Sequence, residues 1–369
     1  MHTMFKTITL ILVLLFAVSV SGRSQVVGKQ YFKYSNTDST VWIGLTTTAD
    51  KMSADVFLHL KGDAETCTHF SFSTDKLSNK HIQLAAISDD KIILTGKLSE
   101  QRFEGIIKME NDLFIMFNAE RLMVNNTLKM NELYRNASQK LLPKDVSSPE
   151  AIIEAKLLVP VETADTVLEQ SLGLFYSLTD DDQQHLRLEQ QLNVAITGFL
   201  SQYAQAASFE GEKGPSFQWF KTIDVTLPWA DGLFTTFSKQ TYVFTGGAHG
   251  MQHNSFVVIK NQDKVALSAD DVFVPEAREE ISKLLTSMLK KNIGIATGDS
   301  LSQKGYFVDE VPFTSNFYIH PVGICFYYNS YEIAPYAYGH TAIHLTYKQL
   351  APFLKTDFYE SIKAAGYLD

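Results

Sequence analysis

Short runs that alternate between apolar and polar positions dominate the first third of the chain. Segments such as DVFLHLKG and RFEGIIKM alternate in the manner of half-buried antiparallel strands. These runs are rich in β-branched and aromatic residues, and turn-forming residues separate them at even spacing without an intervening helical period. The pattern predicts a β-rich domain over residues 25–135, built as an antiparallel sheet, a sandwich or a partly closed barrel.

Two segments of the second half carry the period of an amphipathic helix. The apolar stripe of the first helix comprises Leu192, Ile196, Phe199, Leu200 and Tyr203. The second helix follows Pro275, a residue suited to a first helical position, and its stripe comprises Ile281, Leu284, Leu285, Met288 and Leu289. Strand-like runs lie between and after these helices, with residues 313–329 and 340–350 expected as the last two strands. Helices between antiparallel strand groups predict an α+β domain over residues 151–369.

Residues 136–150 separate the two predicted domains. This segment, NASQKLLPKDVSSPE, is polar and contains two prolines and a pair of serines. Such a composition is typical of a loop between periodic segments. We therefore expect an interdomain linker there.

The first 24 residues have the order of a secretory signal peptide. Lys6 precedes an apolar run from Ile8 to Val18, and small residues follow it. The run is shorter than the about 20 residues that span a membrane, although an uncleaved anchor is the alternative. We expect export to the periplasm or the medium after removal of residues 1–24. Because no cysteine lies near the cleavage zone, we do not expect a lipoprotein.

The formal charge narrows the class of partner. The chain carries 32 basic and 41 acidic side chains, a net charge of −9. Removal of residues 1–24 takes away Lys6 and Arg23 and no acid, which leaves −11. An acidic protein is a poor ligand for nucleic acid. The charge favours encounter with a cationic partner, and simple solubility is the other explanation.

The two cysteines stand in different predicted domains. Cys67 and Cys325 both lie in apolar strand-like runs. Two cysteines do not make a disulfide framework. We expect two buried thiols rather than an interdomain disulfide.

The segment YVFTGGAHGMQH poses the main question about chemistry. As a strand–turn–strand, it uses Gly246, Gly247 and Gly250 as turn-forming residues, and His249 is a residue of the turn. The alternative is a metal or catalytic site built on His249 and His253, but a zinc site needs a third ligand.

Further ligands for such a site lie far along the chain. Three histidines and two aspartates could reach it only through tertiary folding: His320, His340, His344, Asp270 and Asp271. Common nucleophile, phosphate-loop and dinucleotide motifs are absent from the sequence. The acidic run Asp180 to Asp182 fits a helix N-terminus better than a calcium loop. We therefore assign no catalytic residue, no metal site and no cofactor, and we favour a non-enzymatic protein.

A tyrosine-rich stretch near the C-terminus is the first candidate for ligand contact. Tyr331, Pro335, Tyr336 and Tyr338 fall within one predicted loop between strands. Tyrosine offers large, rigid and amphipathic contact area. The alternative is that these rings pack the loop against its own sheet. We rank His249 and its turn second as a contact region.

Three segments, YVFTGGAHG, LSADDVF and GICFYYNSYEIAPYAYG, together resemble one family. It is the extracytoplasmic domain of unknown function shared by the RsiV anti-sigma factor and the PdaC peptidoglycan deacetylase. The resemblance covers about residues 151–354 and implies an α+β fold outside the cytoplasmic membrane. In RsiV this domain binds lysozyme, whereas in PdaC catalysis belongs to a separate domain that has no counterpart here.

The resemblance implies recognition of a cell-envelope ligand, either a lysozyme-like protein or peptidoglycan. Two other functions stay open at this point. The protein could be an enzyme that acts on peptidoglycan or a surface polysaccharide, or a structural component of an envelope assembly.

Overall fold

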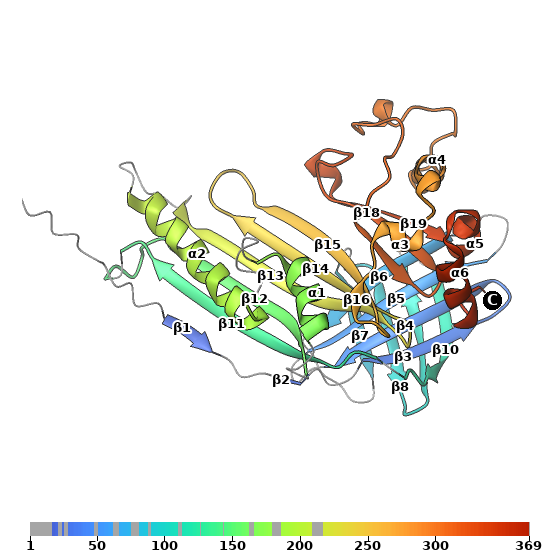
Figure 1. The fold of residues 1–369 in the computed structure, drawn as a ribbon, viewed down its shortest axis with the longest axis horizontal. Helices are drawn as coiled ribbons and strands as arrows, with labels where there is room; N and C mark the ends of the chain where they lie inside the picture. The colour runs from blue at the N-terminus through green and yellow to red at the C-terminus, as the bar shows by residue number, and fades with distance from the viewer. Residues whose placement is uncertain are drawn as a thin grey trace, which may run out of the picture.

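The computed structural model combines a β-barrel, a large mixed sheet and a small three-stranded sheet (Figure 1). It describes residues 17–20, 24–25, 29–47, 51–61, 66–74, 81–87, 90–109, 113–125, 127–142, 144–161, 166–178, 186–208 and 217–368. The β-rich first part and the mixed second part confirm the predicted α+β class.

Eight antiparallel strands close into the barrel. They are β3 (Gln30–Ser35), β4 (Ser39–Thr47), β5 (Met52–Leu60), β6 (Thr66–Thr74), β7 (Ile82–Ala86), β8 (Ile93–Leu98), β9 (Arg102–Lys108) and β10 (Phe114–Leu122). Pairing of β10 with β3 closes the ring, so that these strands leave no open edge. Alternate residues point inward and form one core, including Phe32, Ile43 and Phe72.

The large sheet follows the barrel in the chain. Its strands are β1 (Ala17–Val20), β2 (Ser24–Gln25), β11 (Met130–Lys140), β12 (Glu150–Pro160), β13 (Trp219–Ala230), β14 (Phe234–Phe244), β15 (Met251–Lys260) and β16 (Val265–Ala266). All neighbours are antiparallel except β12 and β13. That parallel pair requires a long crossover, which runs through α1 (Thr166–Tyr176) and α2 (Leu188–Ser208). All five residues of the predicted α2 stripe are buried, which confirms this helix.

The segment predicted as an interdomain linker is instead part of a hairpin. Residues 136–140 belong to β11, and Glu150 begins β12. The two strands pair along their whole length, from Met130 opposite Pro160 to Lys140 opposite Glu150. The polar residues form the turn of this hairpin. The barrel therefore ends at Leu122, and the connection to the large sheet lies between Leu122 and Met130.

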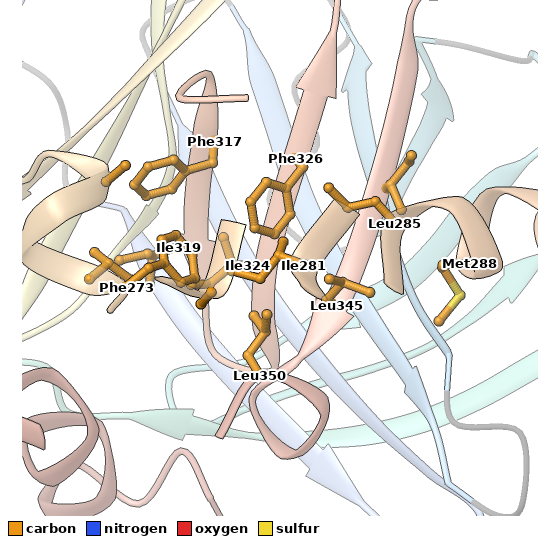
Figure 2. Packing of buried hydrophobic residues seen from close by; sticks show 14 of the residues in the cluster. Phe273, Ile281, Leu285, Met288, Phe317, Ile319, Ile324, Phe326, Leu345 and Leu350 are labelled. Carbon is orange, nitrogen blue, oxygen red and sulfur yellow. The ribbon is translucent and has the colours of Figure 1, made fainter. Parts of the chain in front are cut away.

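The third sheet supports the C-terminal core. It contains β17 (Phe317–His320), β18 (Gly323–Tyr328) and β19 (Thr341–Thr346). Helices α3 (Ala269–Val272), α4 (Arg278–Asn292), α5 (Tyr347–Leu350) and α6 (Thr356–Ala364) surround it. Figure 2 shows side chains of the sheet packed with those of α4: Phe317, Ile324, Phe326 and Leu345 with Ile281 and Leu285.

Residues 313–329, expected as one strand, contain two. The chain reverses at Pro321 and Val322, and β17 pairs with β18 from Phe317–Phe326 to His320–Gly323. Proline has no backbone N–H to donate to a ladder, which fits its place in the turn.

An aromatic interface joins the barrel to the other two sheets. Trp229 of β13 makes edge contacts with three barrel rings, those of Tyr31, Trp42 and Phe57, at centroid distances of 4.8, 5.8 and 5.8 Å. Tyr318 of β17 and Cys325 of β18 complete the same cluster. The outer face of β4–β6 is therefore buried by the rest of the protein rather than exposed to solvent.

Two predictions concern residues outside the described ranges. Residues 1–16, which hold most of the expected signal peptide, are among them, and so is the acidic run from Asp180 to Asp182. Within the described part of the chain, none of the helices has both the length and the apolar character that crossing a bilayer requires.

Candidate functional site

The glycine-rich segment is the tip of the β14–β15 hairpin. Gly246 and Gly247 have φ angles of 100° and 97°, which side chains with a Cβ rarely adopt. A Cβ on Gly250 would overlap the ring of Tyr242, so glycine at this position lets the backbone lie close to that ring. The glycines thus let the chain reverse between Phe244 and Met251 and leave His249 exposed at the tip.

The predicted tyrosine loop docks against this tip. The rings of His249 and Tyr336 stack at a centroid distance of 4.1 Å and an angle of 17°. The carbonyl oxygen of Gly250 accepts hydrogen bonds from the Tyr336 hydroxyl (3.2 Å) and from Nδ1 of His249 (2.9 Å). Tyr331 lies beside Tyr336 at 5.8 Å. Two regions predicted separately as contact sites are therefore neighbours.

Three exposed rings extend this group. Tyr331, Tyr338 and Phe307 have exposed fractions of 50%, 49% and 56%. The Phe307 amide donates to the carbonyl oxygen of Ile333 inside the tyrosine loop (2.9 Å), which places Phe307 next to it. We call His249, Phe307, Tyr331, Tyr336 and Tyr338 the aromatic surface.

A reciprocal amide pairing holds the loop on the sheet. The Asn329 side chain accepts from the Asn254 amide N–H (2.7 Å) and donates to the Asn254 carbonyl oxygen (3.1 Å). Asn316 makes the equivalent contacts one step along, with the Phe256 N–H and the same carbonyl oxygen, each at 3.0 Å. These side chains form hydrogen bonds with backbone N–H and C=O groups of β15 and hold the base of the loop in place.

The loop itself contains a constrained residue. Tyr331 has a φ of 72°, which is uncommon for a bulky side chain. Its amide donates to the carbonyl oxygen of Ala334 (2.9 Å), and the Asn329 amide donates to the Glu332 carboxylate (3.0 Å). Pro335 precedes the short helical turn Tyr336–Tyr338. Outlying backbone of this kind often marks a contact site.

The alternative site around His249 and His253 does not assemble within the described residues. His253 is exposed on β15. Among the residues that the structure describes, the single His/Cys/Asp/Glu group close enough to share a metal ion includes neither His249 nor His253. Asp270 pairs with Arg278 at 2.8 Å, and Asp271 accepts from Ser268 at the start of α3.

That single group lies elsewhere, between the barrel and the third sheet. It comprises Cys67 of β6, His320 of β17 and His344 of β19, whose donor atoms all lie within 4.8 Å of one another. Cys67 Sγ is 4.0 Å from His320 Nδ1, and His320 Nε2 is 3.2 Å from His344 Nδ1. Cys67 and Cys325 are buried without a disulfide bond, which confirms the expectation from sequence.

A second buried network adjoins this group. Asp55 accepts hydrogen bonds from Lys29 Nζ (2.9 Å), His69 Nε2 (3.1 Å) and Ser71 Oγ (2.9 Å). The network continues to Tyr318, whose hydroxyl donates to His69 Nδ1 (2.8 Å). Burial alone would raise the pKa of Asp55, but the Lys29 charge and the His69 hydrogen bond outweigh it and lower that pKa to about 2.

The sequence contained a partial signal for the buried group. In FYIH and TAIHLT the histidines occupy the strand positions that alternate with Ile319, Ile343 and Leu345, so each histidine lies on the opposite face from those apolar residues. Cys325 shares that face because it pairs with His344. Nothing local indicated that Cys67 would meet them, because its strand lies some 250 residues earlier in the chain.

Comparison with known proteins identifies a family over part of the chain. Residues 270–348 match the family model DUF3298, a protein of unknown function. The chain therefore carries a DUF3298 domain. It is similar to a solved DUF3298 family member from Bacteroides fragilis, with 24% identity, a TM-score of 0.57, and coverage of 63% of this chain and 96% of that one.

A solved DUF3298 family protein from Pseudomonas aeruginosa is also similar, at 19% identity and a TM-score of 0.46, with coverage of 62% and 96%. None of the curated proteins compared with the chain matches it. The matched DUF3298 residues include the tyrosine loop, His320 and His344. His249 and Cys67 lie outside the match, so each cluster joins the DUF3298 domain to a neighbouring part of the chain.

Proposed function

We propose that this is an exported, non-enzymatic binding protein that recognises a cell-envelope ligand, either a lysozyme-like protein or peptidoglycan. The observation that carries the proposal is the aromatic surface, in which His249 of the hairpin stacks on Tyr336 of the tyrosine loop. Tyrosine and phenylalanine rings held half-exposed provide contact area at little cost in side-chain entropy.

The supports of the aromatic surface favour binding without large rearrangement. The Asn254–Asn329 pairing and the Tyr336–Gly250 hydrogen bond hold the loop against the hairpin before any ligand arrives. A surface ordered in advance loses less conformational entropy on binding. These hydrogen bonds distinguish the aromatic surface from exposed rings that stand alone elsewhere on the protein.

The choice of ligand rests on charge and on the resemblance to the RsiV domain. The net charge of −9, or −11 without residues 1–24, would attract a cationic lysozyme-like enzyme. Such long-range steering mainly raises the association rate and weakens with salt. Ring contacts at the aromatic surface would supply the part of the affinity that survives physiological salt.

Isothermal titration calorimetry tests the proposal directly. The purified protein is titrated with a cationic lysozyme and with soluble peptidoglycan fragments at low and physiological salt. We expect saturable binding of one of them at physiological salt. Tyr336→Ala and Tyr338→Ala should each weaken it by at least about tenfold, as loss of a central aromatic contact does.

Phe114→Ala is the matched control, because Phe114 is also about half exposed but lies on the outer face of the barrel. Its binding should equal that of the unaltered protein. Absence of saturable binding to both ligands at physiological salt would refute the proposal. Equal losses for Phe114→Ala and Tyr336→Ala would exclude the aromatic surface as the site.

A further inference from the structure

Cys67, His320 and His344 make up a compact group of soft and borderline metal ligands in the interior. They come from three strands, β6, β17 and β19, and β19 lies against β6. Cys67 and His344 are almost fully buried, and His320 is completely so. One thiol and two imidazoles are ligands that Zn²⁺ commonly takes in proteins.

Hydrogen bonds define the state of the two imidazoles. The Val322 amide donates to His320 Nδ1 at 3.3 Å, so the proton of the neutral ring is on Nε2 and is donated to His344 Nδ1 at 3.2 Å. Each ring therefore presents an acceptor nitrogen in this arrangement, and a ring nitrogen without a proton is the form that binds metals.

The group is unusual for a core that serves packing alone. The opposite face of the third sheet is built from apolar side chains that need no hydrogen bonds: Ile319, Ile324, Ile343 and Leu345. Three buried polar side chains cost desolvation that apolar residues would avoid. The cluster contains no carboxylate, and its three members are one thiol and two imidazoles.

We propose that Cys67, His320 and His344 form a Zn²⁺ site that ties the barrel to the DUF3298 domain. In a tetrahedral site with Zn–N bonds of about 2.0–2.1 Å and a Zn–S bond of about 2.3 Å, nitrogen ligands lie about 3.3 Å apart, and sulfur and nitrogen about 3.6 Å. The His320–His344 separation of 3.2 Å meets the first value. The Cys67–His320 separation of 4.0 Å is measured to Nδ1, the other nitrogen of that ring. The three donor atoms lie within 4.8 Å of one another, so the sulfur must approach the bound nitrogens by up to about 1 Å.

Binding changes the protons of the site in a defined way. Cys67 releases its thiol proton to solvent and binds as thiolate. His320 offers only one ring nitrogen. If Nε2 binds the ion, the ring proton moves to Nδ1, and His320 gives up both its contact with His344 and the hydrogen bond from the Val322 amide. If Nδ1 binds the ion, the proton stays on Nε2 and only the contact with the Val322 amide is replaced. The ion then closes a covalent link between residues separated by more than 250 positions, which stabilises the docking of the two parts.

Metal analysis of the full chain tests the site. The protein is stripped with a chelator and reloaded with Zn²⁺, and metal is counted by mass spectrometry. Co²⁺ is added in a parallel sample to look for the thiolate-to-cobalt absorption band. We expect one Zn²⁺ per chain and a thiolate band. Cys67→Ser should abolish the band, and Cys67→Ser and His344→Asn should each weaken Zn²⁺ binding by at least about tenfold.

Cys325→Ser is the matched control, since Cys325 is buried on the same sheet face but lies outside the group. It should keep both the metal and the band. Circular dichroism of each metal-free variant separates loss of a ligand from loss of folding. A folded, unaltered chain that binds no stoichiometric Zn²⁺, or binds Cu⁺ in its place, overturns the proposal. An equal loss in Cys325→Ser also overturns it.

Discussion

At the scale of single residues, the barrel interface depends on a buried ion pair. Asp55 and Lys29 are in contact at 2.9 Å, and Lys29 also donates to the carbonyl oxygens of Leu227 and Pro228 in β13. Removing one partner of such a pair leaves a buried charge without compensation. Lys29 therefore links Asp55 of the barrel wall to the backbone of the large sheet.

This arrangement predicts a specific dependence of stability on pH. The pKa of Asp55 is about 2 in the folded protein and about 3.9 in the unfolded chain, so its contribution is present above about pH 4 and is lost as the pH falls towards 2. The contribution is about 2–3 kcal/mol. Urea unfolding should show that Asp55→Asn loses most stability at pH 7 and approaches the unaltered protein near pH 2.

Asp357→Asn, which removes an exposed carboxylate from α6, is the control for this experiment. Its difference from the unaltered protein should stay small at every pH. A penalty for Asp55→Asn that is the same at pH 7 and pH 2 would show that the carboxyl group does not titrate as the ion pair requires.

At the scale of elements, the third sheet depends on close approach at Gly323. A Cβ there would overlap the backbone carbonyl oxygen of Leu345 on β19. Gly323 is also where β18 begins after the Pro321–Val322 reversal and pairs with both His320 and Thr346. Any side chain at this position must push β19 away or distort the turn.

Gly323→Ala should therefore destabilise the protein by at least about 1–3 kcal/mol, the range for overpacking a tight interior. Gly298→Ala is the control, because a Cβ there meets open space, and it should change stability by less than about 0.5 kcal/mol. Chemical denaturation measures both variants. Equal stability of the two would mean that β18 and β19 can separate freely.

At the scale of the whole molecule, Trp229 is the main apolar anchor between barrel and sheets. It is almost fully buried, contacts three barrel rings and donates from Nε1 to Asp231 at 2.9 Å. Because this interface joins parts with separate cores, its loss should uncouple them as well as destabilise them.

Calorimetry should show one cooperative unfolding transition for the unaltered protein. Trp229→Ala should lower stability by about 3–5 kcal/mol and resolve the barrel from the rest as a second transition. Met116→Ala, on the outer surface of β10, should leave a single transition at nearly the same temperature. Two transitions already present in the unaltered protein would contradict this view of the interface.

Local periodicity determined much of the secondary structure. Spacing within a single segment is enough to predict the α2 stripe, the α4 stripe and the inward residues of the barrel strands. This spacing can be read directly from the sequence. The turn at the β14–β15 tip could also be predicted from its glycines, because a positive φ angle or a close backbone approach restricts a position to glycine. The β11–β12 hairpin was missed because its polar turn resembles a linker, although β12 alternates regularly through Ile153, Ala155 and Leu157.

Tertiary structure alone decided how distant segments meet. Barrel closure and the parallel β12–β13 pair depend on pairing partners that no single segment specifies. Alternation along β6 puts Cys67 and His69 on the face away from the barrel core, but it does not specify that another sheet covers that face. The same holds for His249 on Tyr336 and for Cys67 with His320 and His344. The sequence pattern determines on which face of a strand a side chain lies. Which residues contact that face depends on how whole sheets pack against one another.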